Sequence, residues 1–157
     1  MIMKKPKYFR WIFAVELVGI LSAFLSRSAA RIYAQTILKP PFSPPGILFP
    51  VVWTILYAFM GAGAARVAAG PDRICRFRAL NIFVVQLIVN FFWSLIFFNA
   101  QAFGFAFLWL VLLWILIAVM MVLFYREDRL AGLLQIPYFL WVTFAGYLNF
   151  AVWQLNR

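Results

Sequence analysis

Polar side chains that could bind a ligand occur inside stretches that are otherwise apolar. Gln86, Asn90 and Trp93 are spaced by four and three residues, so that in a helix they share one face. An amide in hydrocarbon needs a hydrogen-bond partner, which either a neighbouring helix or a ligand supplies. The spacing alone favours bonds between helices, and a ligand-lining face is the alternative.

Two further faces carry aromatic side chains at helical spacing, and one of them also carries a small residue. Such stripes pack in a core more often than they hold a cofactor. A small residue one turn from a tryptophan, however, leaves space beside a flat aromatic wall. Three such faces in one chain therefore predict a shared internal cavity. The two faces are Phe49, Trp53 and Tyr57 in one segment, and Tyr138, Trp141, Ala145 and Asn149 in another.

The composition excludes several kinds of catalysis. The chain has no histidine and a single cysteine, Cys75, which removes the Ser-His-Asp triad, most zinc and iron sites and any internal disulfide. Of the four acids, Glu127 and Asp128 adjoin Arg126 and Arg129 and are interpreted as a solvated loop cluster. We expect no metal site and no required cofactor. The net charge of +10 is spread over the ends of apolar segments, which indicates anionic lipid head groups rather than nucleic acid.

These side chains must be positioned by helices that cross a membrane. No charged residue occurs between Ala79 and Tyr125, which is long enough for two crossings of about 20 residues each. The whole chain predicts an all-α integral membrane protein, a single domain of residues 1–157 forming a bundle of five transmembrane helices. The predicted helices are 11–25, 47–69, 79–98, 103–125 and 130–155.

The long connection of residues 26–46 stands apart from the shorter ones. Pro40, Pro41, Pro44 and Pro45 fix backbone angles and exclude regular helix there. A stiff loop of this kind is more typical of a cap over a cavity than of a free linker, which is the alternative. In the last segment, Pro137 predicts a kink.

The distribution of basic residues predicts the orientation. Ten of the fourteen lie on the side that holds the N-terminus. The positive-inside rule then places the N-terminus inside and the C-terminus outside, in a multi-pass protein of a bacterial plasma membrane. Glu16 inside the first segment argues against a cleaved secretory signal. We interpret Glu16 as a carboxylate near the inner interface, with a proton or ligand counter-charge as the alternative.

Four motifs in order resemble the translocator proteins, also called tryptophan-rich sensory proteins or peripheral-type benzodiazepine receptors, and suggest a bacterial member. Together they extend roughly from residue 33 to residue 153. The motifs are Lys39-Pro40-x-Phe42-x-Pro44-Pro45, Val52-Trp53-x-x-Leu56-Tyr57-x-x-Met60-Gly61, Gln86-Leu87-x-x-Asn90-x-x-Trp93 and Pro137-Tyr138-x-x-Trp141-x-x-Phe144-Ala145.

The resemblance implies a homodimer of five-helix chains with a pocket closed by the first loop. It implies a receptor or sensor for flat hydrophobic ligands, namely protoporphyrin-type porphyrins and isoquinoline or benzodiazepine-type molecules. Porphyrin would then be a ligand or a substrate of tetrapyrrole metabolism. Carried over by motif position, the pocket comprises Tyr33, Trp53, Gln86, Asn90, Trp93, Trp141 and Ala145, to which the aromatic faces add Phe49 and Tyr138.

The resemblance also links Trp53 and Trp141 to light-dependent oxidative breakdown of porphyrin, so enzymatic activity is left open. Two alternatives are a transporter of porphyrin or another hydrophobic molecule, and a regulatory scaffold that its ligand only stabilises. Phe42 and Phe91 stand where many members have tryptophan. Phe150 and Gln154 replace the tyrosine and arginine of the proposed cholesterol motif, so specific cholesterol binding is not predicted.

Overall fold

The helices are the only regular elements among the described residues. A computed structural model describes residues 5–71 and 74–157. Five of its helical stretches are long and apolar enough to cross a membrane, which confirms the all-α five-helix bundle. The elements are α1 (Tyr8–Thr36), α2 (Leu48–Ala69), α3 (Ile74–Ser94), the π-helical turn η1 (Leu95–Asn99), α4 (Phe103–Glu127), α5 (Arg129–Leu133) and α6 (Ile136–Leu155).

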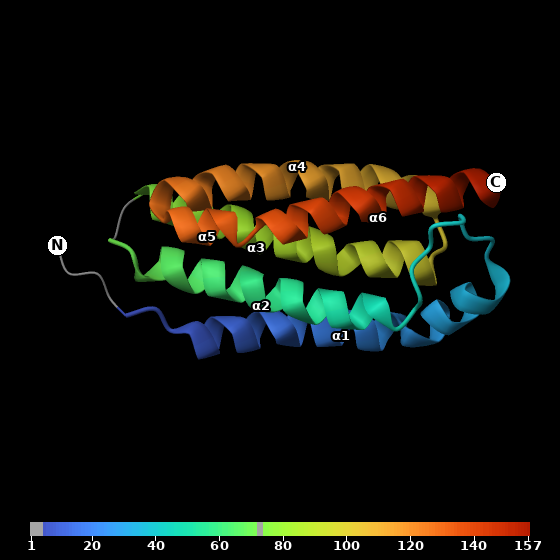
Figure 1. Ribbon diagram of the computed structural model, residues 1–157, viewed down its shortest axis with the longest axis horizontal. Helices are drawn as coiled ribbons and strands as arrows, with labels where there is room; N and C mark the ends of the chain where they lie inside the picture. The colour runs from blue at the N-terminus through green and yellow to red at the C-terminus, as the bar shows by residue number, and fades with distance from the viewer. Residues whose placement is uncertain (1–4, 72–73) are drawn as a thin grey trace.

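The long helices lie side by side along one axis. α1 packs along α2, α3 packs along α4, and α4 also packs along α6. In the ribbon view, α1 and α2 form one edge of the bundle and α4 and α6 the other, with α3 between them (Figure 1). The C-terminus lies at the end of the bundle opposite to the one at which α1 begins.

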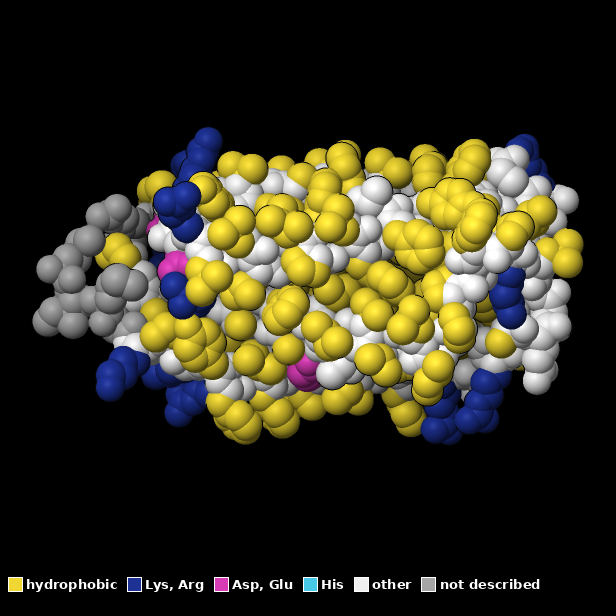
Figure 2. Space-filling model, viewed as in Figure 1, with side chains coloured by type: hydrophobic (Ala, Val, Ile, Leu, Met, Phe, Trp, Pro, Cys, Tyr) yellow, Lys and Arg dark blue, Asp and Glu magenta, His cyan; other side chains and the backbone are white. Residues whose placement is uncertain are grey.

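The surface agrees with a bilayer environment. In the space-filling view, hydrophobic side chains cover the middle of the visible face, and Lys and Arg gather at its two ends (Figure 2). Large apolar side chains such as Phe9, Ile20 and Phe24 are more than half exposed on α1. Exposed apolar surface of this extent matches lipid rather than water. The protein is thus a multi-pass integral membrane protein.

The first helix is longer than the sequence analysis predicted. It was expected to end near Leu25, but α1 continues to Thr36, so the long connection shortens from residues 26–46 to residues 37–47. The segment after Leu25 contains Ala, Arg and Gln, which favour helix, and neither Gly nor Pro. Its polarity marks the edge of the apolar span and not the end of the helix. Pro40 lies just beyond the end of α1.

The predicted third and fifth segments also differ in detail. α3 begins at Ile74 instead of residue 79, and its last turn is the π-helical η1. The fifth segment is divided into α5 and α6 by a turn at Leu134–Gln135, with Pro137 in the first turn of α6. Proline is favoured in that position because it has no N–H to donate. The predicted kink at Pro137 is therefore wrong in form, because the helix is interrupted just before Pro137 instead of bending at it.

The connection between α1 and α2 crosses the end of the bundle. Figure 1 shows it rising from α1 towards the end of α6 and returning to the start of α2. Leu38 forms two hydrogen bonds with the side chain of Asn156, just after α6. Pro40 is buried, and Ser43 N–H donates to Pro40 O at 3.1 Å. The connection is therefore attached to the end of α6, and its role as a cap over a cavity stays a prediction.

Three residues that entered the charge count and the orientation argument lie outside the described residues. They are Lys4, Asp72 and Arg73.

Candidate functional site

A chain of hydrogen bonds crosses the core between three helices. The Tyr57 hydroxyl donates to Asn90 Oδ1 at 2.9 Å, and Asn90 Nδ2 donates to the Tyr138 hydroxyl at 2.7 Å. That hydroxyl donates to Gln86 Oε1 at 2.9 Å, and Gln86 Nε2 lies 3.7 Å from Met60 Sδ. All five side chains are buried. Gln86 and Asn90 thus bridge helices, as the favoured interpretation of their spacing states.

Aromatic rings surround this polar chain on the side of α2 and α6. The Trp53 ring lies 5.4 Å from Tyr57 and 6.1 Å from Tyr138, between ring centroids. Phe49 meets Trp141 edge to face at 5.7 Å. These separations are typical of favourable aromatic pairs. The predicted residues of α2, α3 and α6 therefore form one continuous cluster of rings and amides.

Two predicted residues lie in a second cluster towards the capped end. Tyr33 of α1 contacts Phe97 at 5.3 Å, and Trp93 stacks on Phe97 at 5.1 Å with an interplanar angle of 26°. Trp93 Nε1 donates to Asn149 Oδ1 at 3.2 Å, while Asn149 Nδ2 donates to Phe103 O at 2.8 Å. Tyr33 and Trp93 thus meet through a shared phenylalanine, directly below the connection that caps the bundle.

Ala145 is predicted to leave space beside the Trp141 ring, but it does not line the groove that Trp141 lines. Ala145 is buried one helical turn from Trp141, in the same hydrophobic cluster as the central rings. A larger side chain at this position would press on its neighbours, because protein interiors are close-packed. The structure thus brings all nine predicted ligand residues into two adjoining clusters.

One hydrogen-bond donor is unpaired in the central cluster, the group of rings and amides of α2, α3 and α6 described above, and it belongs to Trp141. Its indole Nε1 is buried and has no hydrogen-bond partner among the described residues. Buried polar groups are ordinarily paired, so an unpaired one calls for an explanation. The Trp141 side chain also lines a groove of about 420 Å³ between α2 and α6, together with Val52, Ile55, Leu56, Pro137, Leu140 and Phe144.

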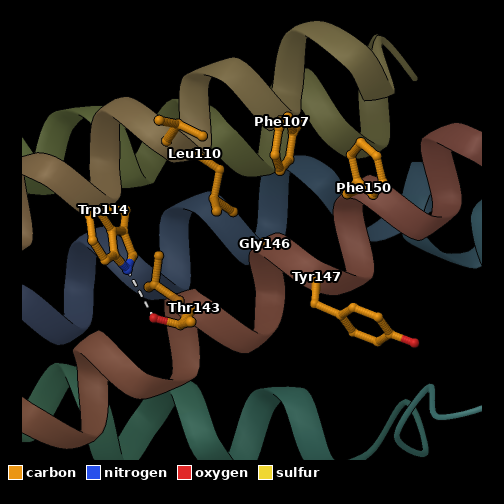
Figure 3. A pocket seen from close by; sticks show the side chains of 9 residues that line it. Phe107, Leu110, Trp114, Thr143, Gly146, Tyr147 and Phe150 are labelled. Atoms are coloured by element: carbon orange, nitrogen blue, oxygen red, sulfur yellow. Dashed lines mark hydrogen bonds between the residues drawn. The ribbon is translucent and has the colours of Figure 1, made fainter.

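A second groove, of about 340 Å³, lies between α4 and α6 on the other side of α6. Figure 3 shows Leu110, Trp114 and Phe107 of α4 opposite Gly146 of α6, with Trp114 Nε1 bonded to Thr143 Oγ1 at 2.9 Å. The Tyr147 side chain points away from these rings (Figure 3). None of the predicted ligand residues lines this groove. Its side chains therefore serve as controls for tests of the central cluster.

Charges are placed at the edges of the bundle rather than in the cluster. Arg66 forms a two-point ion pair with Asp128, with Nε and Nη2 each 2.8 Å from a carboxylate oxygen. The Arg66 guanidinium holds the pKa of Asp128 below its ordinary value. Glu16 lies half-buried on α1 and makes no ion pair within the described part of the chain. The described residues contain no cluster of His, Cys, Asp or Glu that could hold a metal ion.

Two further buried side chains form hydrogen bonds that the sequence patterns do not predict. Met60 accepts from Gln86, but an apolar residue in an apolar helix carries no signal of such a role. Gln135 is fully buried at the break between α5 and α6, and its Nε2 donates to Phe59 O and Ala131 O. An amide just before Pro137 is the signal that could have identified it.

Comparisons with known proteins agree with this architecture. Residues 11–154 match the model of the TspO/MBR family. The chain is 40% identical over 140 residues to the tryptophan-rich protein TspO of Chlorobaculum tepidum, covering 88% of this chain and 89% of that protein. It is 40% identical over 151 residues to protein CrtK of Rhodobacter capsulatus, covering 92% of each. The human translocator protein is 34% identical over 138 residues, covering 87% of this chain and 81% of that protein. The chain belongs to the TspO/MBR family.

Proposed function

We propose that this protein is a membrane receptor or sensor that binds a flat, hydrophobic, porphyrin-type ligand among α2, α3 and α6. The observation that carries the proposal is the buried Trp141 indole N–H, which has no hydrogen-bond partner among the described residues and lies in a cluster of aromatic rings. A ligand with a hydrogen-bond acceptor on an aromatic framework would satisfy both features. Isoquinoline and benzodiazepine-type molecules share this chemistry and belong to the same proposal.

The residues of the cluster suggest how such a ligand would be held. Trp53, Tyr138 and Phe49 offer ring faces and edges for stacking. The Trp141 N–H would donate one hydrogen bond and so fix the orientation of the ligand. Ligand sites are commonly apolar cavities with a few directed polar groups, and this cluster has that composition. Pairing of two chains in a homodimer remains a prediction.

Binding is tested by titrating protoporphyrin into the purified protein in detergent, in the dark, and following tryptophan fluorescence. We expect saturable quenching in the wild type and about tenfold weaker binding for Trp141→Phe, because one hydrogen bond to the ligand is lost while a ring is kept. Trp114→Phe is the control, since Trp114 lies in the groove between α4 and α6.

Two outcomes would oppose the binding proposal. Equal weakening by both variants would point away from the central cluster. The absence of saturable binding would favour the regulatory scaffold. A transporter would additionally need flux of the ligand across proteoliposomes.

We further propose that bound porphyrin is oxidised by dioxygen under illumination, with Trp53 and Trp141 as nearby oxidisable indoles. The proposal rests on the family resemblance and on the position of both indoles in the central cluster. Illuminated samples of the wild type and of the Trp53→Phe/Trp141→Phe variant, each saturated with protoporphyrin, should differ in the decay of porphyrin absorbance. Unchanged decay with binding retained would exclude a role of these indoles.

A further inference from the structure

The groove between α4 and α6 is apolar and opens towards the lipid. Its volume is about 340 Å³. Gly146 forms part of its floor, because a Cβ at that position would lie 3.2 Å from Leu110 Cδ2. On its rim, the Val111 side chain is 38% exposed. A hollow of this kind in a membrane bundle is filled by hydrocarbon, because the core of the bilayer holds no water.

The polar side chains of the groove are not directed into it. Thr143 Oγ1 accepts a hydrogen bond from Trp114 Nε1 at 2.9 Å and donates one to Phe139 O at 2.8 Å. The Tyr147 side chain points away from the other rings of the groove (Figure 3). A plain hydrocarbon chain therefore suits this groove better than a ligand that needs orienting hydrogen bonds.

One end of the groove leads to a cation. Phe107 of α4 and Phe150 of α6 lie at this end (Figure 3). Both rings contact Trp153, with ring centroids 6.4 Å and 5.9 Å apart. The guanidinium carbon of Arg157 lies 5.6 Å from the centre of the Trp153 ring. A row of aromatic rings thus connects the groove with a positive charge at the end of the bundle.

The length of this row matches one leaflet of a bilayer. Thr143, near one end of the groove, and Trp153, beyond the other end, are ten residues apart on α6. This separation corresponds to about 15 Å along the helix axis. The hydrocarbon core is about 30 Å thick, so that one leaflet contributes about half of it. Tryptophan is enriched where hydrocarbon meets the head groups, which places Arg157 at the level of the lipid phosphates.

The charges around Arg157 favour an anionic partner. The acidic residues that the structure describes are Glu16, Glu127 and Asp128, none of which lies at the start of α4 or at the end of α6. Within the described part of the chain, the ion pair is that of Arg66 with Asp128. Arg157 is therefore not neutralised by an acidic side chain. A guanidinium group binds phosphate through two parallel hydrogen bonds.

We propose that this groove is a binding site for an anionic phospholipid, with one acyl chain between α4 and α6 and the phosphate paired with Arg157. The apolar groove selects the hydrocarbon chain, and the cation selects the head group. None of the nine predicted ligand residues lines the groove. The inference is therefore independent of the proposed porphyrin site.

The site is tested by native mass spectrometry of the full chain in detergent, with equal amounts of phosphatidylglycerol and phosphatidylcholine that carry the same acyl chains. We expect one phosphatidylglycerol molecule per chain to stay bound at collision energies that remove phosphatidylcholine. The reason is that phosphatidylglycerol has no choline cation to oppose Arg157. A wild type that retains neither lipid, or both lipids equally, would overturn the proposal.

Arg157→Gln tests the contact with the head group. We expect the affinity for phosphatidylglycerol to fall about fivefold and that for phosphatidylcholine to stay the same, because one attractive charge near the head group is lost. Arg27→Gln is the matched control, since the Arg27 guanidinium carbon lies 5.0 Å from the centre of the Phe24 ring on α1. An equal loss in both variants would show that only the overall positive charge matters and would overturn the assignment to Arg157.

Val111→Phe tests the groove itself. The larger side chain would occupy the place of the acyl chain from the exposed rim, so that binding of phosphatidylglycerol should fall several-fold. Val119→Phe is the matched control, since Val119 is 42% exposed on the same helix and does not line the groove. Unchanged lipid binding in Val111→Phe would overturn the proposal. A shift of Val111→Phe from dimer to monomer would also overturn it, because the groove would then be an interface between two copies of the chain.

Discussion

A single hydroxyl, that of Tyr138, joins the two buried amides of α3. It accepts from Asn90 and donates to Gln86, and its residue is completely buried. A hydroxyl is suited to this position because it donates and accepts at once. Gly19 on α1 leaves room for the ring of Tyr57 on α2, since a Cβ at Gly19 would collide with that ring. Each hydrogen bond of this polar chain thus depends on one particular donor and one particular acceptor atom.

Tyr138→Phe should lower the free energy of unfolding by about 1–3 kcal/mol, because it leaves Gln86 Oε1 without a donor in a buried site and removes one acceptor of Asn90. Thermal unfolding in detergent would measure the change. The control is Tyr147→Phe, since the Tyr147 side chain is half exposed and its hydroxyl has no hydrogen bond within the described residues. Equal stability of the two variants would show that the polar chain contributes little.

At the scale of elements, the bundle depends on the close approach of α1 and α2. At Gly61 the two backbones nearly touch, because a Cβ there would lie 2.6 Å from Ile12 Cα and 3.0 Å from Trp11 O. Small residues at helix interfaces in membranes allow backbones to approach and pack. At Gly61, the Gly- and Ala-rich part of α2 therefore mediates packing within the chain.

Gly61→Ala should destabilise the protein by roughly 1–3 kcal/mol, because overpacking against a backbone outweighs the gain in helix propensity of up to about 1 kcal/mol. The measurement is again thermal unfolding in detergent. Gly46→Ala is the comparison, since a Cβ at Gly46 would meet nothing within 4 Å. If Gly61→Ala were as stable as the wild type, α1 would have to shift freely along α2.

For the whole molecule, polar contacts fasten the bundle at both ends. At one end, Arg66 of α2 binds Asp128 and the Tyr8 hydroxyl of α1, and Asp128 also caps α5 through Ala131 N–H. At the other end, Asn156 holds the capping loop. Between these ends the surface is mostly apolar, with Glu16 of α1 as an exception, so that these polar contacts lie where water and head groups begin.

The Arg66–Asp128 pair predicts a dependence of stability on pH. The pKa of Asp128 lies below its ordinary value of 3.8 in the folded state, so the stabilisation is present at neutral pH and is lost as the pH falls from about 5 through the folded pKa. Asp128→Asn should cost roughly 1–2 kcal/mol at pH 7, because an ion pair and a charged helix cap are weakened. Asp128→Asn should also lose less stability than the wild type as the pH falls, as measured by unfolding midpoints between pH 7 and pH 2. Glu127→Gln should lose as much stability on acidification as the wild type. An equal loss in Asp128→Asn would contradict the assignment of this pH dependence to Asp128.

The orientation in the membrane can be read from two positions at opposite ends of the bundle. Cys75 is exposed at the start of α3, on the side that the positive-inside rule places inside. In intact cells, a membrane-impermeant maleimide should label Arg157→Cys in a Cys75→Ser background, but should label Cys75 only after permeabilisation. The reverse pattern would invert the predicted orientation.

The sequence alone determined the membrane location, the number of crossings and the faces that carry amides and aromatic rings. These are local properties, since hydropathy over about 20 residues and a period of 3.6 residues need no knowledge of other segments. The nine predicted ligand residues follow from the family resemblance and from these faces. The local pattern therefore identifies the residues of the central cluster but not the partner of each one.

Only the tertiary structure decided where helices end and which atoms pair. The onset of polar residues predicts a helix end near Leu25, but this onset marks the edge of the hydrocarbon span, and α1 continues to Thr36. The bond of Tyr57 to Asn90 and the bonds of Leu38 to Asn156 join residues far apart in the chain. Such contacts depend on how distant helices are placed relative to one another, which no local pattern records.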